Sequence, residues 1–81
     1  MVEFDRFSVG KVIQRLRIER SLSQEVFSGF ADIARSHLAM IESGSKQANF
    51  ETIWRIANAF SIPPHELVKQ IELEAGKNEP L

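Results

Sequence analysis

The apolar residues of this chain recur at helical spacing in short segments, and residues that end helices separate those segments. No stretch of useful length alternates apolar and polar residues, as a half-buried strand would. In the first segment the apolar residues fall at i, i+3, i+4 and i+7, namely Val9, Val12, Ile13 and Leu16. This spacing predicts an amphipathic helix over residues 8–20 with Ser8 as its N-cap. The chain is therefore expected to be all-α.

Two more helices with a tight turn between them are expected next. Ser23 offers a hydroxyl that can cap a helix over residues 24–31, and Asp32 ends that helix. A third helix can run from residue 34 or 35 to residue 43, because Gly44 suits the left-handed position that follows a helix. Two short helices at this spacing are typical of a helix-turn-helix.

The last two helices are expected on either side of a pair of prolines. Asn49 can cap a fourth helix that follows the polar loop 44–49 and runs to about residue 60. Pro64 suits the first turn of a fifth helix, which is expected to end near residue 74. Residues 1–75 would then form one domain and residues 76–81 a flexible tail.

The apolar faces of these helices predict the core. One face of the fourth helix is expected to carry Phe50, Ile53, Ala57 and Phe60, with Trp54 and Ile56 at its edges. The residues expected in the core are Phe27, Ile33, Leu38, Ile41, Ile53 and Phe60.

Length and charge limit the number of domains and the kinds of partner. A chain of 81 residues has room for one domain. Its net charge of -1, taken alone, counts against nucleic-acid binding. The charge is unevenly distributed, however. Residues 1–59 carry eight Lys and Arg against seven Asp and Glu, so the acidic excess lies in residues 60–81.

The chain contains no cysteine, which excludes disulfides and thiolate sites and favours a cytoplasmic location. Its start lacks a basic segment followed by an apolar stretch, so no secretion signal is expected. No apolar run approaches the length of about 18 residues that a membrane span needs, so no membrane partner is expected either.

The segment from Ser23 to Gly44, SQEVFSGFADIARSHLAMIESG, closely resembles the helix-turn-helix of the lambda-repressor/Cro-like, or XRE, family. It matches the family pattern without a gap, and with the flanking helices the resemblance covers about residues 9–68. Asp32 stands where the family commonly has glycine. Ala34 stands where it commonly has a capping serine or threonine, so a cap worth about 1 kcal/mol is missing or supplied otherwise. The resemblance implies a five-helix, lambda-repressor-like DNA-binding domain.

The same resemblance implies a DNA-binding transcriptional regulator that recognises a palindromic operator as a homodimer. It implies no catalytic activity, no cofactor, no metal and no small-molecule ligand. The compact form is similar to the controller proteins of restriction-modification systems. An alternative stays open, namely an antitoxin-like or adaptor protein whose main partner is another protein. A neighbouring methyltransferase and endonuclease would support the first interpretation, and a neighbouring toxin would support the second.

In the family the third helix enters the major groove, and the start of the second helix faces a phosphate. The free N–H groups and the dipole of a helix N-terminus attract such an anion. The positions implied for contacts to bases are Arg35, Ser36, His37 and Met40. The positions implied for contacts to phosphates are Ser23, Gln24, Ser43, Ser45, Lys46 and Gln47. Arg35 is the favoured base reader because its planar fork can pair with guanine. Phe30 and Met40 occupy positions that are usually polar in the family.

Two further sets of residues are expected to hold the domain and its dimer together. Arg17 and Glu42 occupy positions that form a mostly buried ion pair in related repressors. One face of the fifth helix can pack against its symmetry mate. The residues expected in that dimer interface are Leu67, Val68, Ile71 and Leu73.

His37 could instead be a metal ligand or a proton-transfer group. Glu42 is the one residue at helical spacing that could join it, which is too few for a ligand set. A polar surface residue is the simpler interpretation.

Overall fold

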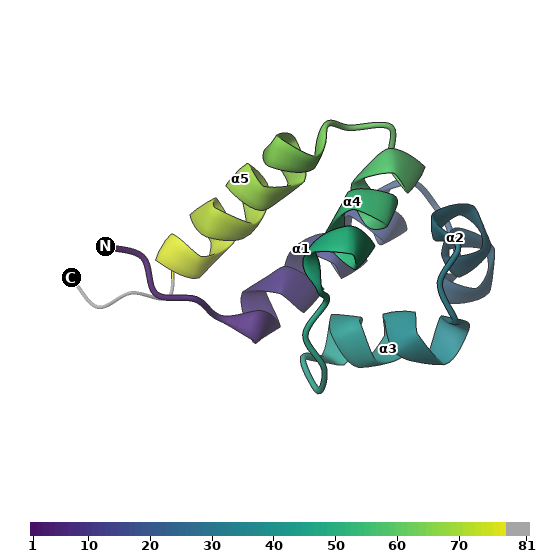
Figure 1. Cartoon of the computed structure of the whole chain (residues 1–81), viewed down its shortest axis with the longest axis horizontal. Helices are drawn as coiled ribbons and strands as arrows, with labels where there is room; N and C mark the ends of the chain where they lie inside the picture. The colour runs from purple at the N-terminus through teal and green to yellow at the C-terminus, as the bar shows by residue number, and fades with distance from the viewer. Residues whose placement is uncertain (78–81) are drawn as a thin grey trace.

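Five α-helices form the regular structure of residues 1–77, the part of the chain that the computed structural model describes (Figure 1). They are α1 (Arg6–Glu19), α2 (Gln24–Ala31), α3 (Arg35–Ser43), α4 (Phe50–Ala59) and α5 (Pro64–Gly76). No strand occurs among the described residues, so the expectation of an all-α fold is confirmed. Within the same range, none of the helices combines the length and apolar character that a membrane crossing requires.

Most helix ends lie where the sequence predicts them, because local hydrogen bonds determine them. Ser23 caps α2 by accepting a hydrogen bond from the backbone N–H of Val26 at 3.1 Å. Asn49 caps α4 in the same way, through the backbone N–H of Thr52 at 2.8 Å. Gly44 follows α3 with a φ of 81°, a left-handed conformation that glycine adopts without strain.

The first helix begins earlier than predicted, at Arg6 rather than at Ser8. Its N-cap is Asp5, whose carboxylate accepts a hydrogen bond from the backbone N–H of Phe7 at 3.0 Å. Ser8, the predicted cap, is buried in the first turn and donates its hydroxyl to the same carboxylate at 3.0 Å. Asp5 is the better cap because its negative charge also interacts favourably with the helix dipole.

The last helix continues past its predicted end, to Gly76. Ala75 is buried, so packing holds the final turn in place. Gly76 therefore belongs to the helix and not to the predicted tail. The end of that tail, residues 78–81, lies outside the described residues.

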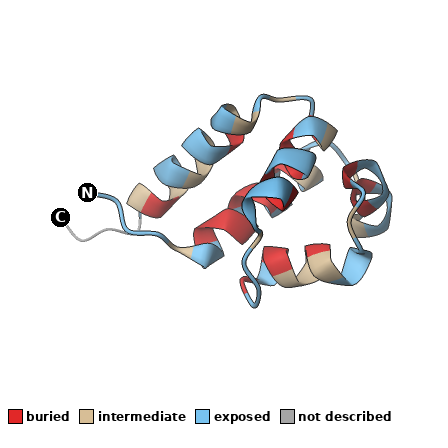
Figure 2. Cartoon of the chain, in the orientation of Figure 1, coloured by how far each residue is buried: buried red, intermediate tan, exposed pale blue. Residues whose placement is uncertain are grey.

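One hydrophobic core lies along the inner faces of the helices (Figure 2). α1 packs on α3 and α5, while α4 packs on α2 and α5. Phe27 of α2 and Phe60 at the end of α4 stack with ring centroids 4.3 Å apart. Ile33, which the sequence places in the core, is only partly buried. The other predicted core residues are buried, namely Phe27, Leu38, Ile41, Ile53 and Phe60.

The buried face of α4 is rotated from the predicted one. Ile56, expected at an edge, is fully buried, whereas Phe50, expected on the apolar face, is 72% exposed. Trp54 is also exposed, and its ring lies edge-on to that of Phe50 with centroids 6.0 Å apart. The difference arises because α2 and α5 both pack on α4, and spacing along the chain does not show which flank they cover.

α1 and α3 approach each other closely at Gly10. A Cβ at this position would overlap the backbone carbonyl oxygens of Ile41 and Glu42, and it would lie 2.8 Å from the carbonyl carbon of Glu42. Because these are backbone atoms, no side-chain rotation can make room. The contact keeps the end of α3 close against the first half of α1.

Candidate nucleic-acid interface

The turn between α2 and α3 joins the two helices as a helix-turn-helix. Asp32 has a left-handed backbone with φ 55° and ψ 47°, which aspartate tolerates better than most residues. Arg55 of α4 donates to the carbonyl oxygen of Asp32 at 2.9 Å and lies 3.4 Å from its carboxylate. α4 therefore stabilises the turn through Arg55.

α3 presents an open face on the side away from the core (Figure 1). Arg35 and Ser36 are exposed in its first turn. His37 and Met40, the other two residues expected to contact bases, are half-buried, so each offers only part of its side chain. Ala34 supplies no side-chain cap to this helix. The residues buried against the rest of the domain are Leu38, Ile41 and Glu42.

The loop after α3 is closed by hydrogen bonds to the carbonyl oxygen of Met40. The backbone N–H groups of Ser45 and Lys46 donate to it at 3.0 and 3.2 Å. The hydroxyl of Ser43 donates to the same oxygen at 3.1 Å and lies 3.0 Å from the hydroxyl of Ser45. The two serines are thus engaged within the loop. Lys46 and Gln47 are exposed, and Lys46 forms no ion pair within residues 1–77.

A buried ion pair joins α1 to α3 beneath the open face. Arg17 donates from Nε to one carboxylate oxygen of Glu42 at 2.7 Å and from Nη2 to the other at 2.9 Å. The two side chains are 11% and 2% exposed. Arg17 also donates to the carbonyl oxygen of Leu22 at 2.7 Å. The hydrogen bonds to Glu42 raise the pKa of the Arg17 guanidinium above its ordinary value. The pair implied by the resemblance is therefore present and bidentate.

Gln24 belongs to the same network, which the sequence does not predict. Its side-chain amide donates to a carboxylate oxygen of Glu42 at 3.1 Å. An amide NH₂ group has two hydrogens, so this bond leaves one for the phosphate contact expected of Gln24. No local pattern signals the bond, because it joins two residues that meet only after α2 packs on α3.

The positive charges of the described chain are not equally available. Lys11, Arg15 and Lys77 lie around the carboxylate of Glu74, with N to O distances of 3.7, 3.1 and 3.8 Å. Five other cations have no carboxylate partner within residues 1–77: Arg6, Arg20, Arg35, Lys46 and Lys69. Two of these five, at the start of α3 and in the loop after it, belong to the expected contact surface. The net charge of -1 thus conceals free positive charge beside α3.

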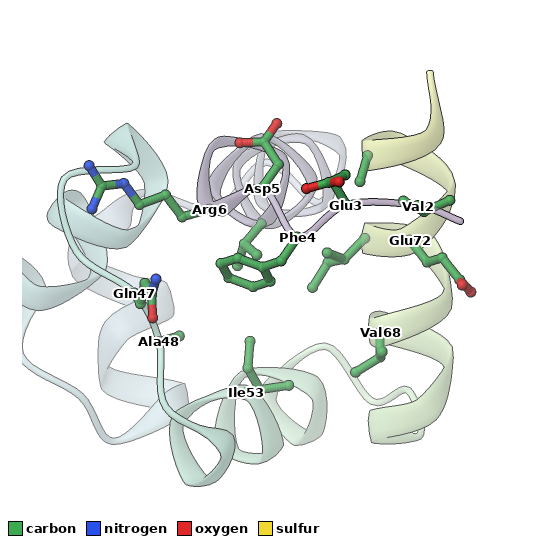
Figure 3. A pocket seen from close by; sticks show the side chains of 13 residues that line it. Val2, Glu3, Phe4, Asp5, Arg6, Gln47, Ala48, Ile53, Val68 and Glu72 are labelled. Atoms are coloured by element: carbon green, nitrogen blue, oxygen red, sulfur yellow. The ribbon is translucent and has the colours of Figure 1, made fainter. Parts of the chain in front are cut away.

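α5 offers only part of the predicted dimer interface. Leu67 is fully buried in the core of its own chain, so its assignment to the interface is wrong. Val68 is exposed and Ile71 is half-buried, and both line a groove of about 400 Å³ between α4, α5 and the N-terminal segment (Figure 3). Leu73 is exposed as well, but it lines a neighbouring hollow that shares Val2 and Glu72 with the groove and also contains Arg15.

Comparison with known families agrees with this geometry. The model of the family described as Helix-turn-helix matches residues 13–67, which is more than half of the chain. The chain belongs to the helix-turn-helix family. As a helix-turn-helix protein of the XRE type it is a DNA-binding regulator, and its fold and family are those of regulators and not of enzymes.

Solved structures share the fold of this helix-turn-helix protein. The restriction-modification controller protein C.AhdI from Aeromonas hydrophila is 29% identical, and the match covers 76% of this chain and 94% of that one with a TM-score of 0.73. The wild-type restriction-modification controller protein C.Esp1396I is 20% identical over 94% and 99% of the two chains, with a TM-score of 0.82. The clp gene regulator ClgR from Corynebacterium glutamicum is 12% identical over 95% and 82%, with a TM-score of 0.83. No curated protein matches the chain.

Proposed function

We propose that this protein is a transcriptional regulator that binds a palindromic operator as a homodimer, and that it acts as a restriction-modification controller. The observation that carries the proposal is the open face of α3, where Arg35 is exposed and unpaired within residues 1–77, above the bidentate pair of Arg17 and Glu42. The pair ties α3 to α1, and a fixed position of the helix favours base reading. The 29% identity to the controller C.AhdI supports the specific assignment.

Arg35 is the proposed base-reading residue. It lies in the first turn of α3, and the N-terminal residues of a recognition helix are those that reach base edges in the major groove. Its guanidinium can donate to O6 and N7 of one guanine. Ser36 would add a hydroxyl contact, and His37 and Met40 would contribute through the open parts of their side chains.

Phosphates would be held on both sides of α3. At the start of α2, near Ser23 and Gln24, the first backbone N–H groups have no acceptor within the helix, and the dipole favours an anion there. On the other side, the loop after α3 would contact the backbone, with Lys46 supplying the charge. The other residues proposed for that loop contact are Ser43, Ser45 and Gln47.

Substitutions at Arg35 and Lys46 should separate base reading from phosphate binding. Arg35→Ala should weaken operator binding by about 1–3 kcal/mol and relax the preference at one base pair in each half-site. Lys46→Ala should weaken binding to operator and random duplex alike and lower the salt dependence. Fluorescence anisotropy on a duplex selected from a random pool and on a scrambled duplex would measure both. Equal losses on the two duplexes for Arg35→Ala would show a phosphate contact instead.

The proposed dimer interface is the groove of Figure 3. Val2, Phe4 and Val68 line it and are exposed, over a floor that includes Ile53 and Ile71. Contiguous apolar surface on a small domain is typical of an interaction site. A two-fold dimer buries the same groove on both copies, and it can set two recognition helices about 34 Å apart to match half-sites one helical turn apart.

Val68→Asp should give a folded monomer with greatly weakened operator binding, because it places a charge in the proposed interface without disturbing the core. Sedimentation velocity would measure the mass, and circular dichroism would check the fold. Phe30→Asp is the matched control, since Phe30 is an exposed apolar residue on α2, outside the groove. A wild-type monomer at tens of micromolar, or an unchanged dimer for Val68→Asp, would contradict this interface.

A further inference from the structure

Arg6 and Phe7 precede residues 13–67, the segment that the family model matches. We propose that Arg6 is a further contact to a DNA phosphate, held in position by a stack of Arg6 on Phe7 and of Phe7 on Gly44. The inference rests on the proposed DNA binding and adds a residue to it from a separate part of the chain.

The packing of α1 on α3 places the first turn of α1 beside the loop after α3. Gly10 lies against the carbonyl groups of Ile41 and Glu42, which leaves no room for a side chain between the two helices. One turn earlier on α1, the ring of Phe7 lies against Gly44, so that a Cβ on Gly44 would be 2.7 Å from Cε1 of that ring. The N-terminal turn of α1 and the proposed phosphate-binding loop therefore form one continuous surface.

Arg6 lies over this surface, at the edge of the groove that is proposed as the dimer interface, and its guanidinium is turned toward the loop after α3. Its guanidinium carbon is 5.6 Å from the centroid of the Phe7 ring, within the range of a cation–π contact. Arg6 is exposed, and no carboxylate within residues 1–77 pairs with it. Figure 3 shows its side chain reaching toward the loop that carries Gln47, while the carboxylate of Asp5 points to a different side.

The chemistry of this arrangement fits a phosphate of the DNA backbone. A guanidinium offers a planar fork that matches two phosphate oxygens, and stacking on a ring reduces the freedom that it must lose on binding. Lys46 in the adjacent loop is a second cation without a carboxylate partner in the described chain. Arg6 would extend the line of contacts that Lys46 begins. A DNA backbone that passes the loop would then also contact the positive charge of Arg6 on α1.

The test is the salt dependence of DNA binding by Arg6→Ala, measured by fluorescence anisotropy with a random-sequence duplex. The slope of log K against log salt concentration should fall by about 0.9 for each protomer, which corresponds to the loss of one phosphate contact. Arg6→Lys should keep most of the slope, because it retains the charge. Lys69→Ala is the matched control: Lys69 is also exposed and without a carboxylate partner in the described chain, but it lies on α5, away from α3.

An Arg6→Ala protein that binds DNA with the wild-type slope would overturn the proposal for Arg6 and leave the proposed function intact. An equal fall for Lys69→Ala would also overturn it, because the effect would then come from net charge alone. If the wild-type protein showed no salt-dependent DNA binding, that result would overturn the proposed function itself. Melting curves by circular dichroism should be the same for all four proteins, since Arg6 and Lys69 are both exposed and outside the core.

Discussion

Replacing Glu42 by alanine should lower the free energy of unfolding by about 3–5 kcal/mol, because it strands a buried guanidinium. Glu42 is 2% exposed in its side chain and accepts hydrogen bonds from Arg17 at 2.7 and 2.9 Å and from Gln24 at 3.1 Å. Without it, Arg17 keeps only the bond to the Leu22 carbonyl. Because the pair is largely buried, solvent compensates for the lost partner only in part.

Urea or thermal denaturation followed by circular dichroism would measure this loss. Glu51→Ala is the control, because Glu51 forms an exposed ion pair with Arg55 at 3.1 Å, and such pairs contribute about 0–1 kcal/mol. Because the pKa of Arg17 is raised, its guanidinium is charged at every pH below the ordinary arginine pKa. The stability that the ion pair contributes is therefore fully present in that range. The difference between the two variants should therefore be constant from neutral to mildly alkaline pH. A loss for Glu42→Ala no larger than that for Glu51→Ala would refute the role assigned to the pair.

Gly10→Ala should destabilise the domain by about 1–3 kcal/mol or more, although alanine is the better helix former. The added Cβ would overlap the carbonyl oxygens of Ile41 and Glu42, so α1 must move away from α3. That movement would also stretch the bonds between Arg17 and Glu42. Operator binding should weaken together with stability, because the same contact positions the recognition helix.

Gly29→Ala provides the opposite control for Gly10→Ala. Gly29 also lies within a helix, α2, but a Cβ there would meet nothing within 4 Å. Alanine should therefore stabilise the domain by about 1 kcal/mol through helix propensity. Chemical denaturation of both variants gives the comparison, and a Gly10→Ala protein as stable as Gly29→Ala would mean that the helices are not in close contact.

Features that depend on neighbours along the chain are predictable from this sequence. The caps at Ser23 and Asn49, the left-handed Gly44 and the start of α5 at Pro64 each depend on hydrogen bonds or steric limits within a few residues. The sequence predicts the start of α1 at Ser8 rather than at Arg6 because Asp5 and Ser8 are both good caps. The helix dipole favours Asp5, and packing favours it further, because Ser8 is buried in the folded domain and donates its hydroxyl to the Asp5 carboxylate.

Features that depend on how the helices pack are not predictable in this way. Phe50 and Ile56 lie on the same helix, and only the positions of α2 and α5 decide that Ile56 is buried and Phe50 is exposed. The sequence predicts Leu67 in the dimer interface because the spacing of apolar residues does not distinguish a helix face that packs within its own chain from one that packs on a partner. The pair of Arg17 and Glu42 could be anticipated through the resemblance, but its bond to Gln24 could not.

The burial of Leu67 within its own chain affects how such a regulator would respond to its own synthesis. A core closed inside one protomer lets each molecule fold alone, so folding is a first-order process. Dimerisation through the proposed groove would be a further, second-order step. At low concentration the amount of dimer would therefore rise with the square of the protomer concentration. Promoter occupancy would lag behind protein synthesis and then increase steeply, with the onset set by the affinity between protomers and not by the folding rate.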